Sequence, residues 1–181
     1  MVSRIKVAAV AALCLFAGSM AQAEGAYRYS GISIGASAID VDDTDFDESD
    51  IGFKWFGGVM VNQNFGFELS YIYGGTINSS SSILRSVESN AFTIEALGQF
   101  PVGGKFSLFA RAGIAFYDAY AVTRAGLVYG NSDEDFTWSV GGSFWVNPRL
   151  GLRLEWQQVP FSTSQYDGDF SMLSLGIAYR F

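Results

Sequence analysis

Histidine is absent from this sequence of 181 residues, cysteine occurs once, at Cys14, and proline occurs only three times. Without histidine, the chain lacks the side chain that most often acts as a general base near neutral pH, so we expect no catalytic residues and no enzyme activity. A single cysteine forms no disulfide within the chain and gives no cysteine-ligated metal site. Beyond residue 23 there is no apolar run of about 18–20 residues, which argues against a helical membrane protein.

The first 23 residues have the layout of a secretory signal peptide, which we expect to be cleaved after Ala23. Its features are two bases, an apolar run and a small-residue triplet: Arg4, Lys6, residues 7–16 and Ala21-Gln22-Ala23. A single spanning helix is the alternative, but the run is shorter than the roughly 20 residues that a bilayer requires. Cys14 would leave with the signal.

Positive charge is also scarce, with 11 Lys and Arg against 18 Asp and Glu. All 18 acids and only nine of the bases lie in residues 24–181, so this single expected domain has a net charge of −9. A charge of this sign disfavours nucleic acid as a partner.

Eight segments of the domain alternate between apolar and small or polar residues with a period of two, which predicts β-strands. They are residues 29–38, 53–61, 67–73, 92–100, 107–116, 136–146, 150–157 and 170–181. Most have roughly the 9–11 residues that a tilted strand needs to span a membrane. No proline-rich linker or repeat divides the domain, so we expect an all-β fold.

The connections between these segments alternate in length. Three are short and rich in turn formers, at residues 62–64, 101–105 and 147–149, and four are long, at about 39–50, 74–90, 118–135 and 159–169. Short turns on one rim and long loops on the other are typical of bacterial outer-membrane barrels. The pattern therefore predicts an eight-stranded antiparallel up-and-down transmembrane β-barrel in the outer membrane of a Gram-negative bacterium.

Alternation alone also fits a soluble, lipocalin-like ligand-binding barrel whose apolar face points inward. Two features favour lipid outside. The few charges within the strands all lie on the face opposite the aliphatics, and aromatic residues gather toward the strand ends, as in the girdles at membrane interfaces. A water-facing sheet normally carries more charge than this.

The charges within the strands would then line the lumen, three acids against three bases: Lys54, Glu68, Glu95, Arg111, Arg153 and Glu155. Eight strands enclose a space that side chains largely fill, so we expect these six to form an ion-pair network, because an unpaired buried charge is costly. The network is either a structural core or the gate of a narrow pore for ions or small solutes. Arg28 and Arg180 are expected to reach the headgroups at the short-turn rim.

The final segment ends in Tyr179-Arg180-Phe181 with alternating aliphatics before it, and resembles the C-terminal assembly signal of outer-membrane barrels, carried by Tyr179 and Phe181. Residues 57–71, GGVMVNQNFGFELSY, resemble the second hairpin of the OmpA-like eight-stranded barrel domains, and residues 140–156 repeat that layout. The resemblance implies a non-enzymatic protein with a structural or surface role. It implies outer-membrane lipid, lipopolysaccharide and the barrel-assembly machinery as partners.

The densest charge lies in the first long connection, where alternating carboxylates are candidate ligands for a hard divalent cation. These candidates are Asp40, Asp42, Asp43, Asp45 and Asp47. The glycine at the sixth position and the spaced final glutamate of an EF-hand are missing. A solvated acidic loop that divalent cations bridge loosely at the lipopolysaccharide surface is the alternative, and no cofactor is expected.

Overall fold

The computed structural model describes residues 25–41, 47–77, 84–123, 128–162 and 167–181, and all of its regular elements are strands. Their bounds are β1 Tyr27–Val41, β2 Asp47–Met60, β3 Phe65–Ile77, β4 Leu84–Gly103, β5 Phe106–Thr123, β6 Val128–Trp145, β7 Leu150–Ser162 and β8 Asp167–Arg180. The described part of the chain has no helix long and apolar enough to cross a membrane.

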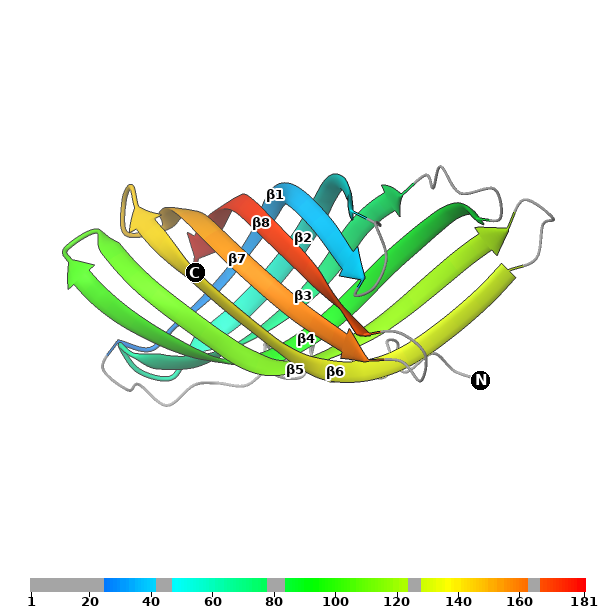
Figure 1. The fold of residues 1–181 in the computed structure, drawn as a ribbon. Coiled ribbons are helices and arrows are strands. Elements are labelled where there is room, and N and C mark those ends of the chain that lie inside the picture. Colours follow the sequence, from blue (N-terminus) through cyan, green and yellow to red (C-terminus); the bar gives the residue numbers. More distant parts are fainter. Residues whose placement is uncertain (1–24, 42–46, 78–83, 124–127, 163–166) are drawn as a thin grey trace.

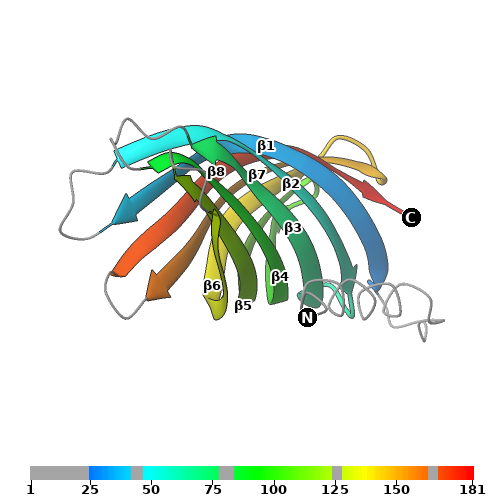
Figure 2. The same cartoon turned by 90° about the vertical axis from the view of Figure 1, so that its right-hand side faces the viewer.

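Each strand pairs antiparallel with the next, and β1 pairs with β8, so the sheet closes into a barrel in the order β1 to β8 (Figure 1). This confirms the predicted eight-stranded antiparallel barrel. Figure 2 shows the strong tilt of the strands, the geometry by which a sheet closes on itself.

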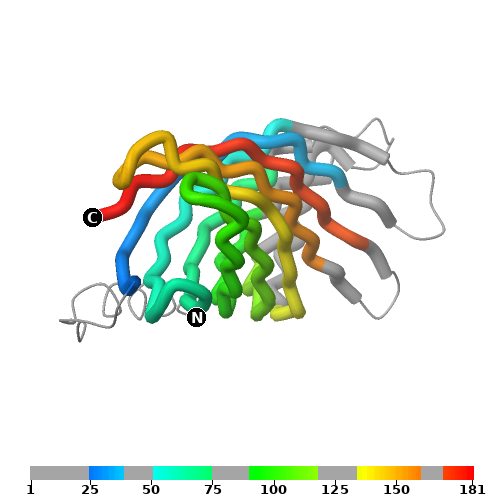
Figure 3. The backbone as a smooth tube through the Cα atoms, turned by 90° about the vertical axis from the view of Figure 1, so that its left-hand side faces the viewer, coloured from blue at the N-terminus to red at the C-terminus, as the bar shows by residue number. Residues whose placement is uncertain are grey.

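The three short turns lie at one end of the barrel, together with the start of β1 and the end of β8 (Figure 3). Two of these turns are built alike. The Asn62 side-chain oxygen accepts hydrogen bonds from the backbone N–H of Asn64 and Phe65, each at 2.8 Å, and Asn147 does the same for Arg149 and Leu150 at 2.9 and 2.8 Å. Asparagine favours this geometry because its short side chain mimics a backbone turn.

Side chains alternate between the outer face and the lumen along the part of each strand whose side chains the structure describes. The outer face is apolar, with Ile34 59% exposed, Leu154 54% and Leu175 59%. In water such a continuous surface would be unfavourable, whereas hydrocarbon chains match it. Phe92 differs from its outward neighbours because it is only 6% exposed, between its cross-strand partners Tyr71 and Phe116.

The strands run further than the alternation predicted. Residues 84–90 of β4 and 128–135 of β6 were expected in loops, yet both pair with β5, whose end also lies in an expected loop (Figure 1). The apolar alternation stops where contact with lipid would end, but backbone hydrogen bonding continues. These outer parts of the strands therefore lack the alternating pattern by which the sequence would have predicted them.

Toward the long-loop end the barrel separates into two sheets. Pairing of β2 with β3 ends at Phe53 and Tyr73, and pairing of β6 with β7 ends at Trp138 and Gln158, within the described residues. Above those levels β7, β8, β1 and β2 form one sheet, and β3 to β6 form the other. Ser37 on β1 donates a hydrogen bond of 2.9 Å to the carbonyl of Gly74 on β3, close to where the first seam opens.

Candidate functional site

The lumen brings together all six charged side chains that the sequence placed on the inner face. They come from five strands: Lys54 from β2, Glu68 from β3, Glu95 from β4, Arg111 from β5, and Arg153 and Glu155 from β7. None is more than 4% exposed. Three positive and three negative charges give the cluster no net charge, the condition under which buried ions are tolerated.

Glu68 lies at the centre of this network. One carboxylate oxygen accepts hydrogen bonds from Arg111 and, at 3.3 Å, from Arg153. The other accepts from Arg153 at 2.7 Å and from the Tyr29 hydroxyl at 2.5 Å. Glu68 on β3 and Arg153 on β7 lie on opposite strands of an eight-stranded ring. Their ion pair therefore crosses the full width of the lumen.

Glu155 closes a second bridge across the lumen. It accepts hydrogen bonds from Lys54, at 2.5 Å, and from Arg111, and its second oxygen lies 3.0 Å from Arg153 Nε. Lys54 also donates to the side-chain oxygen of Gln157 at 2.7 Å, and Gln157 donates to Thr137 at 3.2 Å. The ammonium and the guanidinium groups are thus held at several points, so moving one side chain disturbs the whole set.

Glu95 is the least satisfied member. Its direct partner across the β3–β4 pair is Glu68, a like charge. Arg111 offsets this repulsion, because its Nη1 donates to Glu68 and, at 3.0 Å, to Glu95. Thr93 donates to the same oxygen of Glu95 at 2.9 Å, while the other oxygen has no partner among the described residues.

An aromatic layer lies between this charged layer and the short-turn end. The Arg153 guanidinium is 4.1 Å from the Phe109 ring centroid and 4.6 Å from that of Phe56, so it lies in contact with both rings. Phe109 in turn packs against Gly141, where an added Cβ would meet the ring at 2.4 Å. Glycine in the barrel wall thus makes room for a ring in a narrow lumen.

At the rim the aromatic layer ends in Tyr27, Trp145 and Arg180. The Arg180 guanidinium lies 3.4 Å from the Trp145 ring centroid and 4.0 Å from that of Tyr27, and it donates to the Tyr27 hydroxyl at 3.1 Å. The expectation that Arg180 reaches the headgroups is wrong. Its side chain points inward, since it shares the lumenal parity of Ala178 and two aromatic faces are available there.

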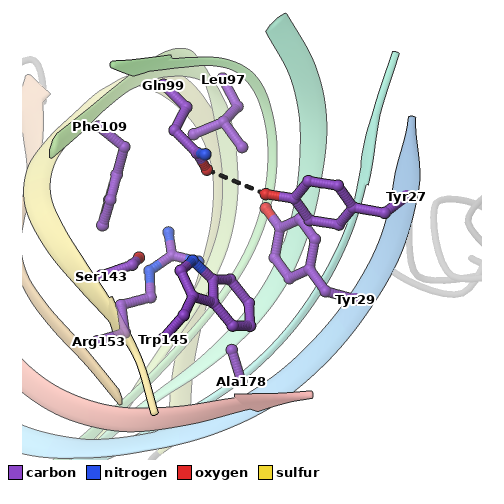
Figure 4. A pocket seen from close by; sticks show the side chains of 9 residues that line it. All are labelled: Tyr27, Tyr29, Leu97, Gln99, Phe109, Ser143, Trp145, Arg153 and Ala178. Atoms are coloured by element: carbon purple, nitrogen blue, oxygen red, sulfur yellow. Dashed lines mark hydrogen bonds between the residues drawn. The ribbon is translucent and has the colours of Figure 1, made fainter. Parts of the chain in front are cut away.

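Little space remains between the two layers. Arg153, Ser143 and Trp145 help to line a cavity there (Figure 4). Its volume of about 10 Å³ is at the lower limit for holding one water molecule. In the same view Tyr27 donates a hydrogen bond of 3.1 Å to Gln99. The described side chains therefore fill the lumen at this level.

The remaining predicted residues are only partly placed. Tyr179 and Phe181 lie on the outer face with their rings edge to face at 5.5 Å, and their role in assembly stays a prediction. The expected signal peptide and Asp42, Asp43 and Asp45 lie outside the described residues. For Asp40 and Asp47 the backbones pair at the end of the first hairpin.

Comparison with known proteins assigns the barrel to a family. Residues 7–181 match the family model described as the outer membrane protein beta-barrel domain. The chain belongs to this family. Outer membrane protein beta-barrel domains are found in Gram-negative outer membranes, and this confirms the predicted location. Together with the apolar outer face, it weighs against the soluble, lipocalin-like alternative.

Curated relatives in this family are similar over nearly the whole chain. Outer membrane protein A of Escherichia coli O157:H7 is 26% identical over 196 residues, covering 98% of this chain and 55% of the relative. Outer membrane protein A of Shigella flexneri is 27% identical over 199 residues, with 98% and 56% covered. The chain spans about half the length of these relatives.

Solved barrels of the outer membrane share the fold. Neisserial surface protein A superimposes with a TM-score of 0.70 at 14% identity, covering 87% of this chain and 99% of that one. Ail of Yersinia pestis, in complex with the heparin analogue sucrose octasulfate, gives a TM-score of 0.61 at 19% identity, with 86% and 99% covered. These likenesses establish the architecture.

Proposed function

We propose that this protein is a non-conducting, non-enzymatic barrel that holds its two extended sheets at the cell surface. The observation that carries the proposal is the ion pair of Glu68 with Arg153, which bars the lumen between opposite strands. A pore would need a continuous water-filled path. The aromatic layer beneath the ion pairs supports the same conclusion, because it leaves space for about one water molecule.

A surface role is supported by the length of the strands. β4, β5 and β6 have 20, 18 and 18 residues, whereas a tilted strand crosses a membrane in about 9–11. The excess extends the sheet of β3 to β6 beyond the membrane on the long-loop side (Figure 1). Outer-membrane barrels turn that side toward the exterior. Partners that meet the cell surface would reach this sheet first.

The long-loop end is strongly acidic. Fourteen of the 18 acids fall in or beside the four long connections, with only two bases, Arg85 and Arg124. This charge favours divalent cations as bridges to lipopolysaccharide and disfavours polyanions. The Ail complex contains a heparin analogue, a polyanion of the kind that this acidic surface disfavours.

The lumen also supports a role without catalysis. The buried hydroxyl of Ser139 has no hydrogen-bond partner among the described residues, so no base is in place to activate it. Glu68, Glu95 and Glu155 are each paired with arginine or lysine, so these carboxylates are held as charged partners in a network that also includes the Tyr29 and Thr93 hydroxyls.

Conductance across a planar lipid bilayer tests the proposal directly. We expect no stepwise current from the wild-type barrel, and none when Arg111 and Arg153 are each replaced singly by methionine, because the aromatic layer still fills the lumen. The triple variant Phe109→Ala, Trp145→Ala and Arg153→Ala removes two rings of that layer together with the Glu68–Arg153 pair, and serves as the control with a widened lumen. Stepwise current from the folded wild-type protein would refute the non-conducting role and favour the narrow pore.

A further inference from the structure

At the short-turn end the barrel encloses an open vestibule of about 880 Å³. Three turns and the first residues of the barrel wall surround it, and its floor is the rim stack of Tyr27, Trp145 and Arg180. Lys105, in the turn between β4 and β5, lines the same space. The space is far larger than the cavity above it, so it admits a molecular group rather than a single water.

Arg180 differs from the two other lumenal arginines in what it pairs with. Arg111 and Arg153 each meet at least two carboxylates, whereas Arg180 meets no acid among the described residues. Its contacts are two aromatic faces and one hydroxyl, and its buried Nε has no hydrogen-bond partner in the described part of the chain. This guanidinium is held in place while its charge is left without a counterion.

The three short turns around the vestibule carry the same sign of charge. The three short turns, residues 61–64, 101–105 and 146–149, contain Lys105 and Arg149 and no Asp or Glu. Gln63 and Asn147 also line the space, and a side-chain amide carries N–H groups that can donate hydrogen bonds. An oxyanion is the group that this set of donors would accept, and arginine matches a phosphate particularly well because its donors form a rigid fork.

We propose that the vestibule binds a phosphate group presented from the periplasmic side, with Arg180 as its main ligand and Lys105 as the second. Phosphate can come from a soluble ester or from the headgroup of an anionic phospholipid in the adjoining leaflet. Exposed apolar residues around the rim, among them Phe100 and Phe181, place the opening at the lipid boundary. The site lies on the short-turn side of the ion-pair network. Its proposed ligand is separate from the proposed surface role.

The test uses the full barrel in uncharged maltoside micelles, which contain no phosphate. The chain has four tryptophans, and the indole N–H signal of Trp145 in a nitrogen–proton spectrum can be assigned with Trp145→Phe. Because Arg180 lies 3.4 Å from this ring, phosphate bound there should shift the signal. One arm adds glycerol 3-phosphate at constant ionic strength, and the other adds short-chain phosphatidylglycerol, with uncharged diacylglycerol of the same chain length as control.

A saturable shift in either arm supports the proposal, and the arm that saturates identifies the source. Arg180→Gln should weaken binding about tenfold or more, since it removes a charged hydrogen-bonding partner. The matched control is Arg149→Gln, which removes the same charge from the rim but does not line the vestibule, and should change affinity less than about twofold.

Lys105→Gln provides a second test that does not depend on the folding of an Arg180 variant, because Lys105 lies exposed in a turn. It should weaken binding about threefold to tenfold. Absence of a saturable shift in both arms would overturn the proposal. Equal weakening by Arg149→Gln and by the two vestibule variants would overturn it as well, since binding would then reflect the diffuse charge of the rim.

Discussion

Arg153 and Arg180 point into the same lumen but are stabilised in different ways. Arg153 lies at mid-depth, bound to Glu68 and Glu155 and in contact with two rings. Arg180 lies at the rim on Tyr27 and Trp145, without an acid partner among the described residues. At mid-depth water is excluded, so a charge needs an opposite charge. At the rim, solvent in the vestibule and an aromatic surface suffice.

Neutralising Glu68, at the centre of the ion-pair network, is the strongest test of this difference between the centre of the lumen and its rim. Glu68→Gln leaves Arg111, Arg153 and Lys54 with two acids, so we expect the free energy of unfolding to fall by about 3–5 kcal/mol. Urea unfolding in lipid vesicles, followed by tryptophan fluorescence, measures this change. The matched control is Glu134→Gln, a carboxylate exposed outside the network, with an expected loss below about 1 kcal/mol. Equal losses for the two variants would contradict the central role of Glu68.

The double variant Glu68→Gln with Arg153→Met sharpens the same point. It removes one charge of each sign and leaves Lys54 and Arg111 balanced by Glu95 and Glu155. We therefore expect it to be more stable, by about 1–3 kcal/mol, than the sum of the two single losses implies. The same urea titrations supply all four corners of the cycle, and strict additivity would mean that the two side chains act independently.

At the rim the expected loss is smaller. Arg180→Met keeps an unbranched side chain over Trp145 and Tyr27 and removes only the charge, so the free energy of unfolding should fall by about 1 kcal/mol. Arg180→Lys should fall between this variant and the wild type. A loss above about 3 kcal/mol for Arg180→Met would show that the rim depends on charge as strongly as the centre does.

Salt should affect the centre of the lumen and the rim differently, and this is the smallest of the expected effects. Raising NaCl from about 0.05 M to about 0.5 M should change the loss in free energy of unfolding caused by Glu68→Gln by less than about 0.5 kcal/mol, because buried pairs are screened little. The affinity of the vestibule for glycerol 3-phosphate should fall over the same range. A penalty that halves in high salt would mean that water and ions reach the centre of the lumen.

Much of this fold could be predicted from the chain. The period of two identified the membrane segments and separated the lipid face from the lumen face, because successive side chains of a strand point to opposite sides. The three short turns, two of them with asparagine, indicated where the hairpins lie. The six lumenal charges could be named, since charges are excluded from the lipid face.

The tertiary structure decided which charges meet. Glu68 and Arg111 are 43 residues apart, and Glu68 and Arg153 are 85 apart, so their contacts depend on the closure and register of the barrel. The same holds for the contact of Arg180 with Trp145 and for the continuation of β4 to β6 beyond the apolar segments. Local sequence sets the face on which a side chain lies, because that follows from the backbone of one strand. Which partner it meets is set by the register and closure of strands that are far apart in the sequence.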